Sequence, residues 1–304
     1  MEFTEAILLT VVTASTPLLI AALGELVCER SGVLNLGVEG MMVMGAACGF
    51  AAASLSGSTT VGIVAGIAAG ALLSCLFALM VLVFAANQVA SGLALTIFGL
   101  GLSGLIGRDF VGKQINAVPE VHIPGLTDLP FVGRLFFGED VFVYASFALV
   151  VGIAWFLNKT RAGLVLRAVG DSHVSAHALG HPVLRVRFFA ILFGGACAGL
   201  AGAYLSLAYT PFWVQGMTAG RGWIALALVV FSSWMPWRAV IGAYLFGAVT
   251  ILQLHAQGFG LPVPSQLMSA LPYLATILVL VLISRSRARA GAPAALGQPF
   301  VPDR

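Results

Sequence analysis

Long apolar runs separated by short polar connections set the pattern of this chain. A helix needs about 20 apolar residues to cross a bilayer, and fewer where neighbouring protein shelters it. Nine runs are candidate membrane spans, although the second begins with polar residues and the seventh is short. They cover residues 6–24, 33–54, 61–85, 89–107, 141–157, 188–209, 223–234, 239–255 and 267–284. The pattern predicts an all-α polytopic membrane protein.

Composition supports this class. Hydrophobic residues make up 60% of the 304 residues and charged residues 9%, against roughly a quarter charged in an average soluble domain. A soluble protein of this composition would have too little polar material to cover its surface. The polar stretches 108–140 and 158–187 are shorter than an ordinary separate domain. We therefore expect a single membrane domain over residues 1–290 and a cytoplasmic tail over residues 286–304.

The distribution of Lys and Arg predicts the orientation, because cytoplasmic loops retain basic residues. The stretch 158–187 carries five basic residues against one acid, Asp171, and four more arginines follow from Arg285 onward. Both regions are expected to face the cytoplasm, and an even number of runs lies between them, as this requires. The N-terminus is then outside and the C-terminus cytoplasmic.

The chain shows signs of an internal repeat. VEGM at residues 38–41 is echoed by VQGM at residues 214–217, at corresponding places in two units of four runs. The first repeat covers residues 6–107 and the second 188–285, with the connecting run 141–157 and the loop 158–187 between them. An odd number of runs separates the units, which gives them opposite orientations. Inverted repeats are a recurring plan of transporters, so the pattern favours a carrier over a membrane-bound enzyme.

The stretch ERSGVLNLGVEGMM, residues 29–42, places ionisable groups and glycines between two apolar runs. Its charges can stay hydrated at the cytoplasmic mouth or pair, and its glycines allow the second span to begin as a broken or re-entrant helix. The inverted counterpart is VQGMTAGRG, residues 214–222, at the outer mouth. We interpret the two stretches as the ends of a gate, with a purely structural role for Glu39 left open. The candidate gate residues are Glu29, Arg30, Asn35, Glu39, Gly40, Gly216 and Arg221.

Apparent nucleotide and metal motifs do not indicate function. GRDFVGKQ at residues 107–114 has Gln where a P-loop needs Ser or Thr. The spaced glycines of GIVAGIAAG, residues 62–70, are interpreted as places where helices approach closely. His173, His177 and His181 have no carboxylate or Cys at ligand spacing and are interpreted as a solvated surface. We expect no enzyme activity in this chain, no metal, no cofactor and no nucleic-acid partner.

The loop 161–187 contains an amphipathic helical candidate, DSHVSAHALG. Asp171 or Ser172 is the predicted cap and Gly180 the predicted stop. A short helix flanked by arginines between two spans is either an interfacial anchor or a surface on which a cytoplasmic partner acts. Composition leaves both interpretations open.

Four blocks carry a resemblance to a known family: ERSGVLNLGVEGMMVMGA, RAVGDSHVSAHALG, GMTAGRGWIALALVVF and WMPWRAVIGAYLFG. They are similar to the permease subunits of bacterial ATP-binding cassette (ABC) importers. Within these, the chain resembles the nucleoside and simple-sugar branch of the branched-chain amino acid permease group. It departs from the family at His173 and Val174, where Asn-Pro is frequent, and at His181. The resemblance implies a permease of the bacterial inner membrane.

The resemblance also implies partners and a coupling helix. The partners are an ATP-binding subunit, a second and related permease, an extracytoplasmic substrate-binding lipoprotein that faces the loop 108–140, and the lipid bilayer. The coupling helix docks on the ATP-binding subunit and transmits its closure to the spans. The residues implied in coupling are Arg167, Gly170, Asp171, Ala176, Leu179 and Gly180.

The leading hypothesis is alternating access that moves a nucleoside inward, with a pentose sugar as the alternative solute. Solute contacts are predicted near the interface of the repeats, and interhelical hydrogen bonding is an equally good interpretation of the same side chains. The candidates are Asn87, Gln88, Ser91 and Thr96. Two rival classes stay open: an ion-coupled secondary transporter and a membrane scaffold without transport.

Overall fold

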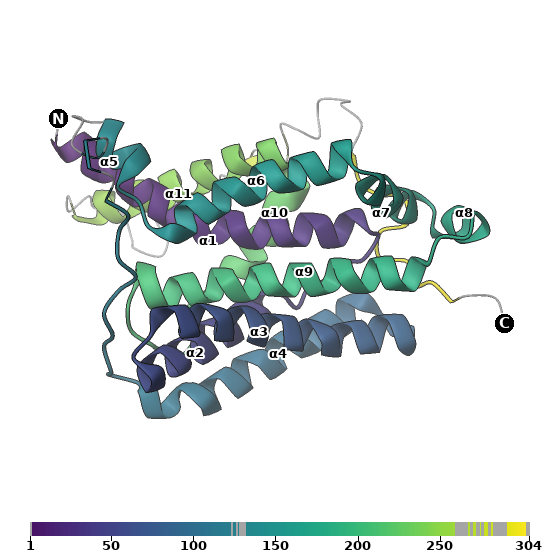
Figure 1. Cartoon of the computed structure of the whole chain (residues 1–304), viewed down its shortest axis with the longest axis horizontal. Coiled ribbons are helices and arrows are strands. Elements are labelled where there is room, and N and C mark those ends of the chain that lie inside the picture. The colour runs from purple at the N-terminus through teal and green to yellow at the C-terminus, as the bar shows by residue number, and fades with distance from the viewer. Residues whose placement is uncertain are drawn as a thin grey trace.

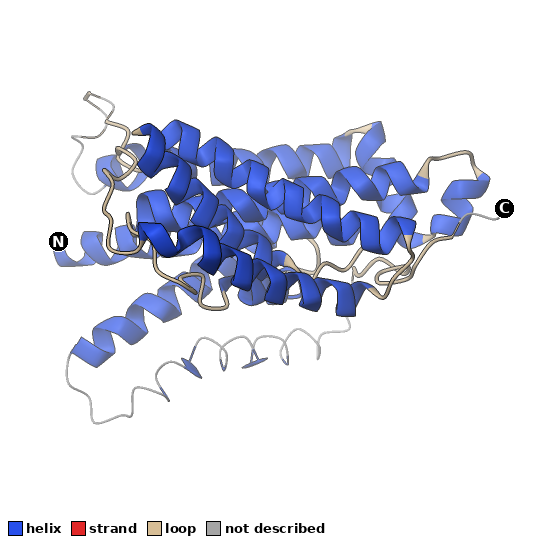
Figure 2. Cartoon of the chain, turned by 90° about the horizontal axis from the view of Figure 1, so that it is seen from below, coloured by secondary structure: helices blue, strands red, loops and turns tan. Residues whose placement is uncertain are grey.

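The computed structural model describes residues 2–122, 124, 125, 127, 132–258 and 291–301, with seven helical positions between 267 and 281. Within these residues the chain is helical, as predicted (Figures 1 and 2). The helices are α1 (Glu2–Arg30), α2 (Val38–Ser56), α3 (Thr59–Ala78), α4 (Gln88–Gly107), α5 (Val132–Phe137), α6 (Val141–Lys159), α7 (Arg161–Asp171), α8 (His173–Ala178), α9 (Val183–Tyr204), α10 (Arg221–Phe231) and α11 (Pro236–Gly258). Short helical turns continue three of them: η1 (Leu79–Val83), η2 (Arg108–Phe110) and η3 (Leu205–Tyr209).

Seven helices of the described chain are long and apolar enough to cross a membrane, which confirms a multi-pass membrane protein. They match the predicted runs one to six and eight. The seventh run, 223–234, corresponds to α10, whose 11 residues extend about 16 Å. This helix alone is too short for the predicted span, because the hydrocarbon core of a bilayer is roughly 30 Å thick. The non-helical segment 210–220 before it supplies the rest of the crossing. The ninth run, 267–284, lies mostly outside the described residues.

The long helices run roughly along the long axis of the molecule (Figure 1). The N-terminus and α5 lie at one end, called here the α5 end, while α7, α8 and the C-terminus lie at the opposite, α7–α8 end. Small residues bring the central helices together. A Cβ on Gly70 of α3 would collide with Gly195 and Gly199 of α9, and a Cβ on Gly45 of α2 with Gly199. The predicted role of spaced glycines in close helix approach is confirmed.

Two helices, called here the half-helices, begin inside the bundle after a non-helical segment. The first is α2, which is 19 residues long. It follows the non-helical segment 31–37, which enters from the α7–α8 end, where Gly32 lies against Gly170. The helix then runs toward the α5 end, where the rings of Phe50 and Phe110 pack edge to face with their centroids 6.5 Å apart. The segment 31–37 and α2 therefore form one broken crossing, which is one of the two forms, broken or re-entrant, that the glycines of this stretch allow.

The other half-helix, α10, runs in the opposite direction. It follows the non-helical segment 210–220, which enters from the α5 end, where Trp213 lies against Gly107 of α4. The turn after α10 reaches the α7–α8 end, where Trp234 contacts Glu29 of α1. An inverted repeat requires equivalent helices to run in opposite directions, and α2 and α10 do so. The extent of the two repeats along the rest of the chain stays a prediction.

Candidate functional site

The starts of the two half-helices meet at Glu39, in the first turn of α2. Its side chain is buried and accepts hydrogen bonds from Thr218 Oγ1 (2.6 Å), Gly220 N (2.9 Å) and Gly222 N (2.6 Å). These donors precede or open α10, where backbone N–H groups lack helical partners and the helix dipole favours negative charge. Gly220 offers no side-chain cap, so Glu39 caps α10 from another helix. We call these four residues the junction.

Glycines make this close approach possible. A Cβ on Gly222 would lie 2.5 Å from the Cα of Glu39 and 2.8 Å from its carboxylate. A Cβ on Gly40 would lie 2.7 Å from the Cα of Thr96 in α4. Real Cβ atoms do not approach other atoms this closely, so both positions exclude larger residues. The glycines let the start of α2 fit between α10 and α4.

The segment 31–37 is held by α1 and by its own side chains. Asn35 N donates to Glu25 Oε1 of α1 (3.0 Å), and Asn35 Oδ1 accepts from Gly37 N (2.9 Å). Glu25 and Asn35 are both buried. Irregular backbone at membrane depth is tolerated only where neighbouring protein satisfies its polar groups. Asn35, predicted as a gate residue, supports the shape of the segment 31–37.

Helix α4 supports the same segment from the other side. Gln88 Oε1 accepts from Leu34 N (2.8 Å), and Thr96 Oγ1 donates to Leu36 O (3.0 Å). Both side chains are buried. Gln88 and Thr96 therefore bond α4 to the non-helical segment 31–37, which is a structural role close to the interhelical hydrogen bonding that the sequence leaves open.

The other two candidates for the solute path lie on the same part of α4. Asn87 is exposed and caps the helix, its Oδ1 accepting from Ala90 N (2.9 Å). Ser91 is buried one turn further on. The structure brings all four candidates to the half of α4 nearest the segment 31–37. Contact between these side chains and a solute stays a prediction.

Glu29 and Arg30 fasten the end of α1 to the turn after α10. Glu29 Oε2 accepts from Trp234 Nε1 (2.6 Å), and Arg30 donates to Trp234 O through Nε (3.2 Å) and Nη2 (2.9 Å). The expectation of a hydrated charge is wrong for Glu29, which is only 1% exposed. Arg30 is half-buried, and both side chains bind Trp234. Ser233 and Trp234 have positive φ angles of 51° and 57°, a strained conformation that this anchoring sustains.

Gly216 and Arg221 shape the turn before α10. Gly216 is exposed and has a φ of +72°, which glycine adopts without strain. Arg221 Nη1 donates to Met217 O (3.1 Å), and the guanidinium lies 5.7 Å from the ring centroid of Tyr209. The sequence interpretation places Glu39 and this stretch at opposite mouths. The structure corrects it, because both stretches extend into the bundle and the three donors of the junction meet Glu39 there.

At the α7–α8 end, α7 and α8 form a short helical pair. Ser172 caps α8 by accepting from Ser175 N (3.3 Å), and the chain turns at Gly180 with a φ of +84°. One of the two predicted caps and the predicted stop are confirmed. Gly170 lies too close to the carbonyl of Arg30 for a Cβ to fit. Helix α7 therefore rests directly on the end of α1.

The remaining residues implied in coupling divide by exposure. Ala176 is buried in an apolar cluster with Val169, whereas Leu179 is 79% exposed. Asp171 is exposed and Arg167 is half-buried. The helical pair is thus fixed on its inner side and presents an apolar side chain outward.

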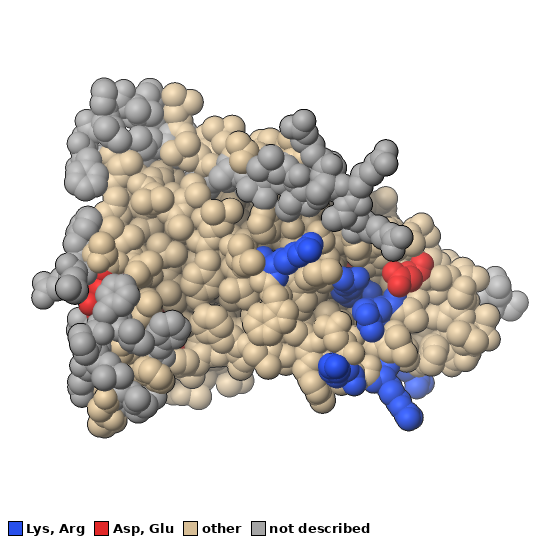
Figure 3. Space-filling view, turned by 90° about the horizontal axis from the view of Figure 1, so that it is seen from above, with Lys and Arg blue, Asp and Glu red and all other residues tan. Residues whose placement is uncertain are grey.

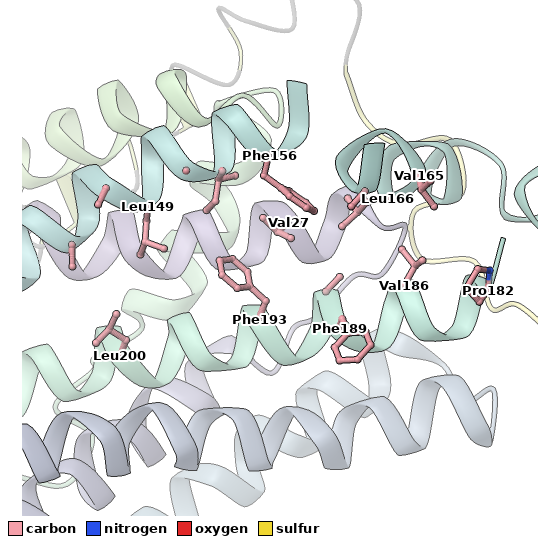
Figure 4. Close-up of a pocket in the computed structure, with 16 residues that line it drawn as sticks. Val27, Leu149, Phe156, Val165, Leu166, Pro182, Val186, Phe189, Phe193 and Leu200 are labelled. Atoms are coloured by element: carbon pink, nitrogen blue, oxygen red, sulfur yellow. The ribbon is translucent and has the colours of Figure 1, made fainter. Parts of the chain in front are cut away.

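A groove of about 900 Å³ lies between α6 and α9. Val27 of α1 lies at its floor (Figure 4). Leu149 and Phe156 of α6 and Phe193 and Leu200 of α9 line it, and its walls are almost entirely apolar. Burying polar groups without hydrogen-bond partners costs free energy. The groove is therefore a poor path for a polar solute.

Half-helices that begin inside a bundle are typical of membrane transporters, and the fold and the junction together define a protein of that class. A family described as branched-chain amino acid transport system / permease component matches residues 7–283. The chain belongs to this family. Permeases of this kind work with an ATP-binding subunit and a substrate-binding partner.

Curated relatives agree with this assignment. The chain is 42% identical over 301 residues to a putative glucose ABC transporter permease protein of Haloferax volcanii, with 92% of each chain covered. It is 33% identical over 302 residues to a guanosine ABC transporter permease protein of Bacillus subtilis, covering 94% of this chain and 93% of the relative. It is also 33% identical over 281 residues to a nucleoside ABC transporter permease protein of Lactococcus lactis, covering 87% and 88%. The chain is a permease subunit of an ABC importer and not itself an enzyme.

Sequence reasoning missed two parts of the site. The donors Thr218 and Gly222 lie within the stretch VQGMTAGRG but were not singled out, although its repeat position was a signal. Arg187 was counted with the basic residues of a cytoplasmic loop, yet it is fully buried and donates through Nε to Ser31 O (3.2 Å). Its position at the start of an apolar run was the only signal. Among the described residues, no group of three His, Cys, Asp or Glu side chains is placed to hold a metal ion.

Proposed function

We propose that residues 1–290 form one membrane domain of two inverted repeats and supply one half of the path of an ATP-driven importer. The junction carries this proposal. A carboxylate on the half-helix of one repeat caps the half-helix of the other, so relative motion of the repeats acts on this contact. Alternating access requires two states related by such a motion.

The α7–α8 end faces the cytoplasm of a bacterial cell, and the α5 end, with the N-terminus, faces outward. Retention of basic residues on the cytoplasmic side supports this orientation. On the face shown in Figure 3, the visible Lys and Arg side chains lie from the middle of the molecule toward the α7–α8 end. Lys159, Arg161 and Arg185 are exposed around α7 and the start of α9. Glu120, Glu139 and Asp140 precede α6, on the outward side.

Helix α8 acts as the coupling helix. Val174 is 67% and Leu179 79% exposed, and an apolar groove in the ATP-binding subunit would remove both side chains from water. Behind α8, Gly170 of α7 rests on Arg30 and Gly32. Along this route, a displacement of α8 therefore reaches the start of the segment 31–37 only through α7.

The exposed face of α4 meets a second, related permease. Large apolar side chains cover this face, which continues outward from the side that holds the segment 31–37. They are Leu93, Ile97, Phe98, Leu100 and Leu105. Pairing there places the two copies of α4 beside a shared path, and lipid covers the remaining apolar surface. A substrate-binding lipoprotein docks at the α5 end, on the loop 108–140.

The solute is an uncharged molecule that bears several hydroxyl groups, with a nucleoside as first candidate. Relatives named for guanosine and for nucleosides support it. The putative glucose permease with 42% identity supports a simple sugar as second candidate. The Glu39 carboxylate is already bound by three donors, so the junction offers no free charge to an ionic solute.

Competition experiments test the solute. Proteoliposomes contain the permease pair and the ATP-binding subunit, with the binding protein added outside, and take up radiolabelled guanosine. We expect excess unlabelled nucleosides to abolish uptake and excess glucose or ribose to leave it unchanged. Uptake of glucose with no uptake of guanosine would replace the first candidate by the second. Uptake of leucine alone would contradict both.

A further inference from the structure

The segment 291–301, called here the C-terminal segment, folds back onto the α7–α8 end. Two backbone hydrogen bonds hold it: Ala295 N donates to Gly170 O (2.9 Å), and Gly297 N donates to Gly32 O (3.1 Å). The first bond reaches the end of α7, and the second reaches Gly32, at the entry of the segment 31–37. Ala295 is itself only 3% exposed. The C-terminal segment thus makes specific contacts with two parts of the site.

An aromatic contact attaches the same segment to α8. The ring of Phe300 lies between those of His173 and His177, with both centroid distances 5.3 Å and both interplanar angles near edge to face. Phe300 is 8% exposed and shares an apolar cluster with Val169 and Ala176. Aromatic pairs in this geometry attract each other beyond the burial of their area. The inner face of α8 is therefore built partly from the C-terminal segment.

A buried arginine completes the attachment. Arg187 of α9 donates through Nη1 to Gln298 O (3.0 Å) and through Nε to Ser31 O (3.2 Å), and its Nη2 lies 3.3 Å from His173 Nδ1. Burial, with the neighbouring Arg187 guanidinium, lowers the pKa of His173, which favours a neutral ring that accepts this hydrogen bond. A buried guanidinium needs all its acceptors. One acceptor, Gln298 O, lies in the C-terminal segment, and another, Ser31 O, lies in the segment 31–37.

A further contact reaches the end of α1, where Arg30 Nη1 donates to Gly291 O (3.1 Å). The other nitrogens of this guanidinium bind Trp234 O, after α10. The C-terminal segment is therefore bonded to α8 at one end and to the α1–α10 contact at the other. It crosses the entry of the segment 31–37 between these two points.

We propose that the C-terminal segment is a positioning element that transmits displacement of α8 to the segment 31–37, and so to the junction. This inference rests on the proposed function, in which α8 meets the ATP-binding subunit. The contact of Gly170 with Arg30 links α7 to α1, but α8 itself lies beyond α7. The C-terminal segment adds a direct connection from α8, through Phe300, to Gly32 through the backbone of Gly297.

Replacement of the Phe300 ring tests this role. Proteoliposomes hold the permease pair with its ATP-binding subunit and the binding protein, and they receive differently labelled guanosine and glucose together. Uptake and ATP hydrolysis are measured in the same vesicles. For Phe300→Ala we expect the solute transported per ATP hydrolysed to fall about five- to tenfold, while hydrolysis and co-purification of the subunits stay near wild type. Phe300→Tyr keeps the ring and should restore the ratio.

Two matched controls separate transmission from packing. Val301→Ala truncates an exposed neighbour and should leave the ratio unchanged. Ala295→Pro removes the N–H bonded to Gly170 O with Phe300 intact and should lower the ratio, whereas Ala294→Pro on the exposed side should not.

An unchanged ratio in Phe300→Ala overturns the inference, and so does loss of co-purification or of ATP hydrolysis, which would show docking or folding instead. Wild-type vesicles that take up neither solute with ATP overturn the proposed function itself. The two failures are thus distinguishable, because the first requires a wild type that transports.

Discussion

At the scale of single residues, the position of Glu39 explains why a membrane protein keeps an acid in its interior. A buried carboxylate is costly unless hydrogen bonds compensate for its lost hydration. Glu39 receives three, two of them from backbone N–H groups at the start of α10. Hydrogen bonds to a charged acceptor contribute about 1.5–3 kcal/mol each. The acid therefore holds two repeats together at the point where both backbones are broken.

Glu39→Gln should destabilise the protein, because a neutral amide turns one acceptor oxygen into a donor that faces N–H groups. We expect a loss of about 2–4 kcal/mol in the free energy of unfolding, seen as a lower midpoint of thermal unfolding in detergent. Glu5→Gln, near the N-terminal end of α1 and only half-buried, serves as the control. Equal stability of the two variants would show that the junction does not hold the half-helices.

Glu139 predicts a pH dependence on the outward side. Burial, with Asp140 and Glu120 nearby, raises its pKa from 4.5 to about 7. The folded chain therefore favours the protonated acid. Its contribution to stability is fully present below pH 4.5 and is lost as the pH rises through about 7.

Glu139→Gln should thus raise the midpoint of thermal unfolding more at pH 8 than at pH 5. Thermal scans of the purified protein at both values measure the difference. Asp109→Asn, at an acid that is 74% exposed, should show no such trend. A gain for Glu139→Gln of the same size at both pH values would contradict the raised pKa.

At the scale of elements, the half-helices α2 and α10 depend on glycines that admit another backbone. Gly222→Ala would place a Cβ 2.5 Å from the Cα of Glu39, where no flexible side chain can yield. We expect a large loss of stability or failure to fold, measured as a low yield of monodisperse protein. Gly152→Ala in α6, where nothing lies within 4 Å, should be neutral or stabilising by about 0.5–1 kcal/mol. Equal yields of both variants would contradict the packing at the junction.

The elements also show what the sequence could predict. Seven of the nine predicted apolar runs are long helices among the described residues, and the glycines of residues 29–42 predicted a broken or re-entrant start for α2. Hydropathy cannot separate a half-helix from a short complete span, so it does not show that α10 covers only part of its crossing.

The long-range partners of the site were less accessible. Glu39 and Gly222 are 183 residues apart, and Arg187 and Gln298 are 111 apart. Such contacts follow from the whole packing and leave no local periodicity. The same limit applies to the contact of Phe300 with α8, because no local pattern in the tail of the chain predicts it.

At the scale of the whole molecule, one chain of contacts runs from the proposed docking surface to the junction. It begins at α8, passes through Phe300 and Gly297 to Gly32, and continues along the segment 31–37 to Glu39. Bonds to α1 and α4 support that segment on both sides. Through this connection, a partner that binds at the α7–α8 end can act on the junction without touching the interior of the bundle.

Energy dependence of uptake tests the central claim most directly. Proteoliposomes contain the permease pair and the ATP-binding subunit. The binding protein and labelled guanosine or glucose are added outside, with or without hydrolysable ATP on the α7–α8 side. The account predicts uptake that requires ATP and the ATP-binding subunit and persists after ionophores collapse proton and sodium gradients. Uptake that follows an ion gradient without that subunit would contradict it and establish a secondary transporter.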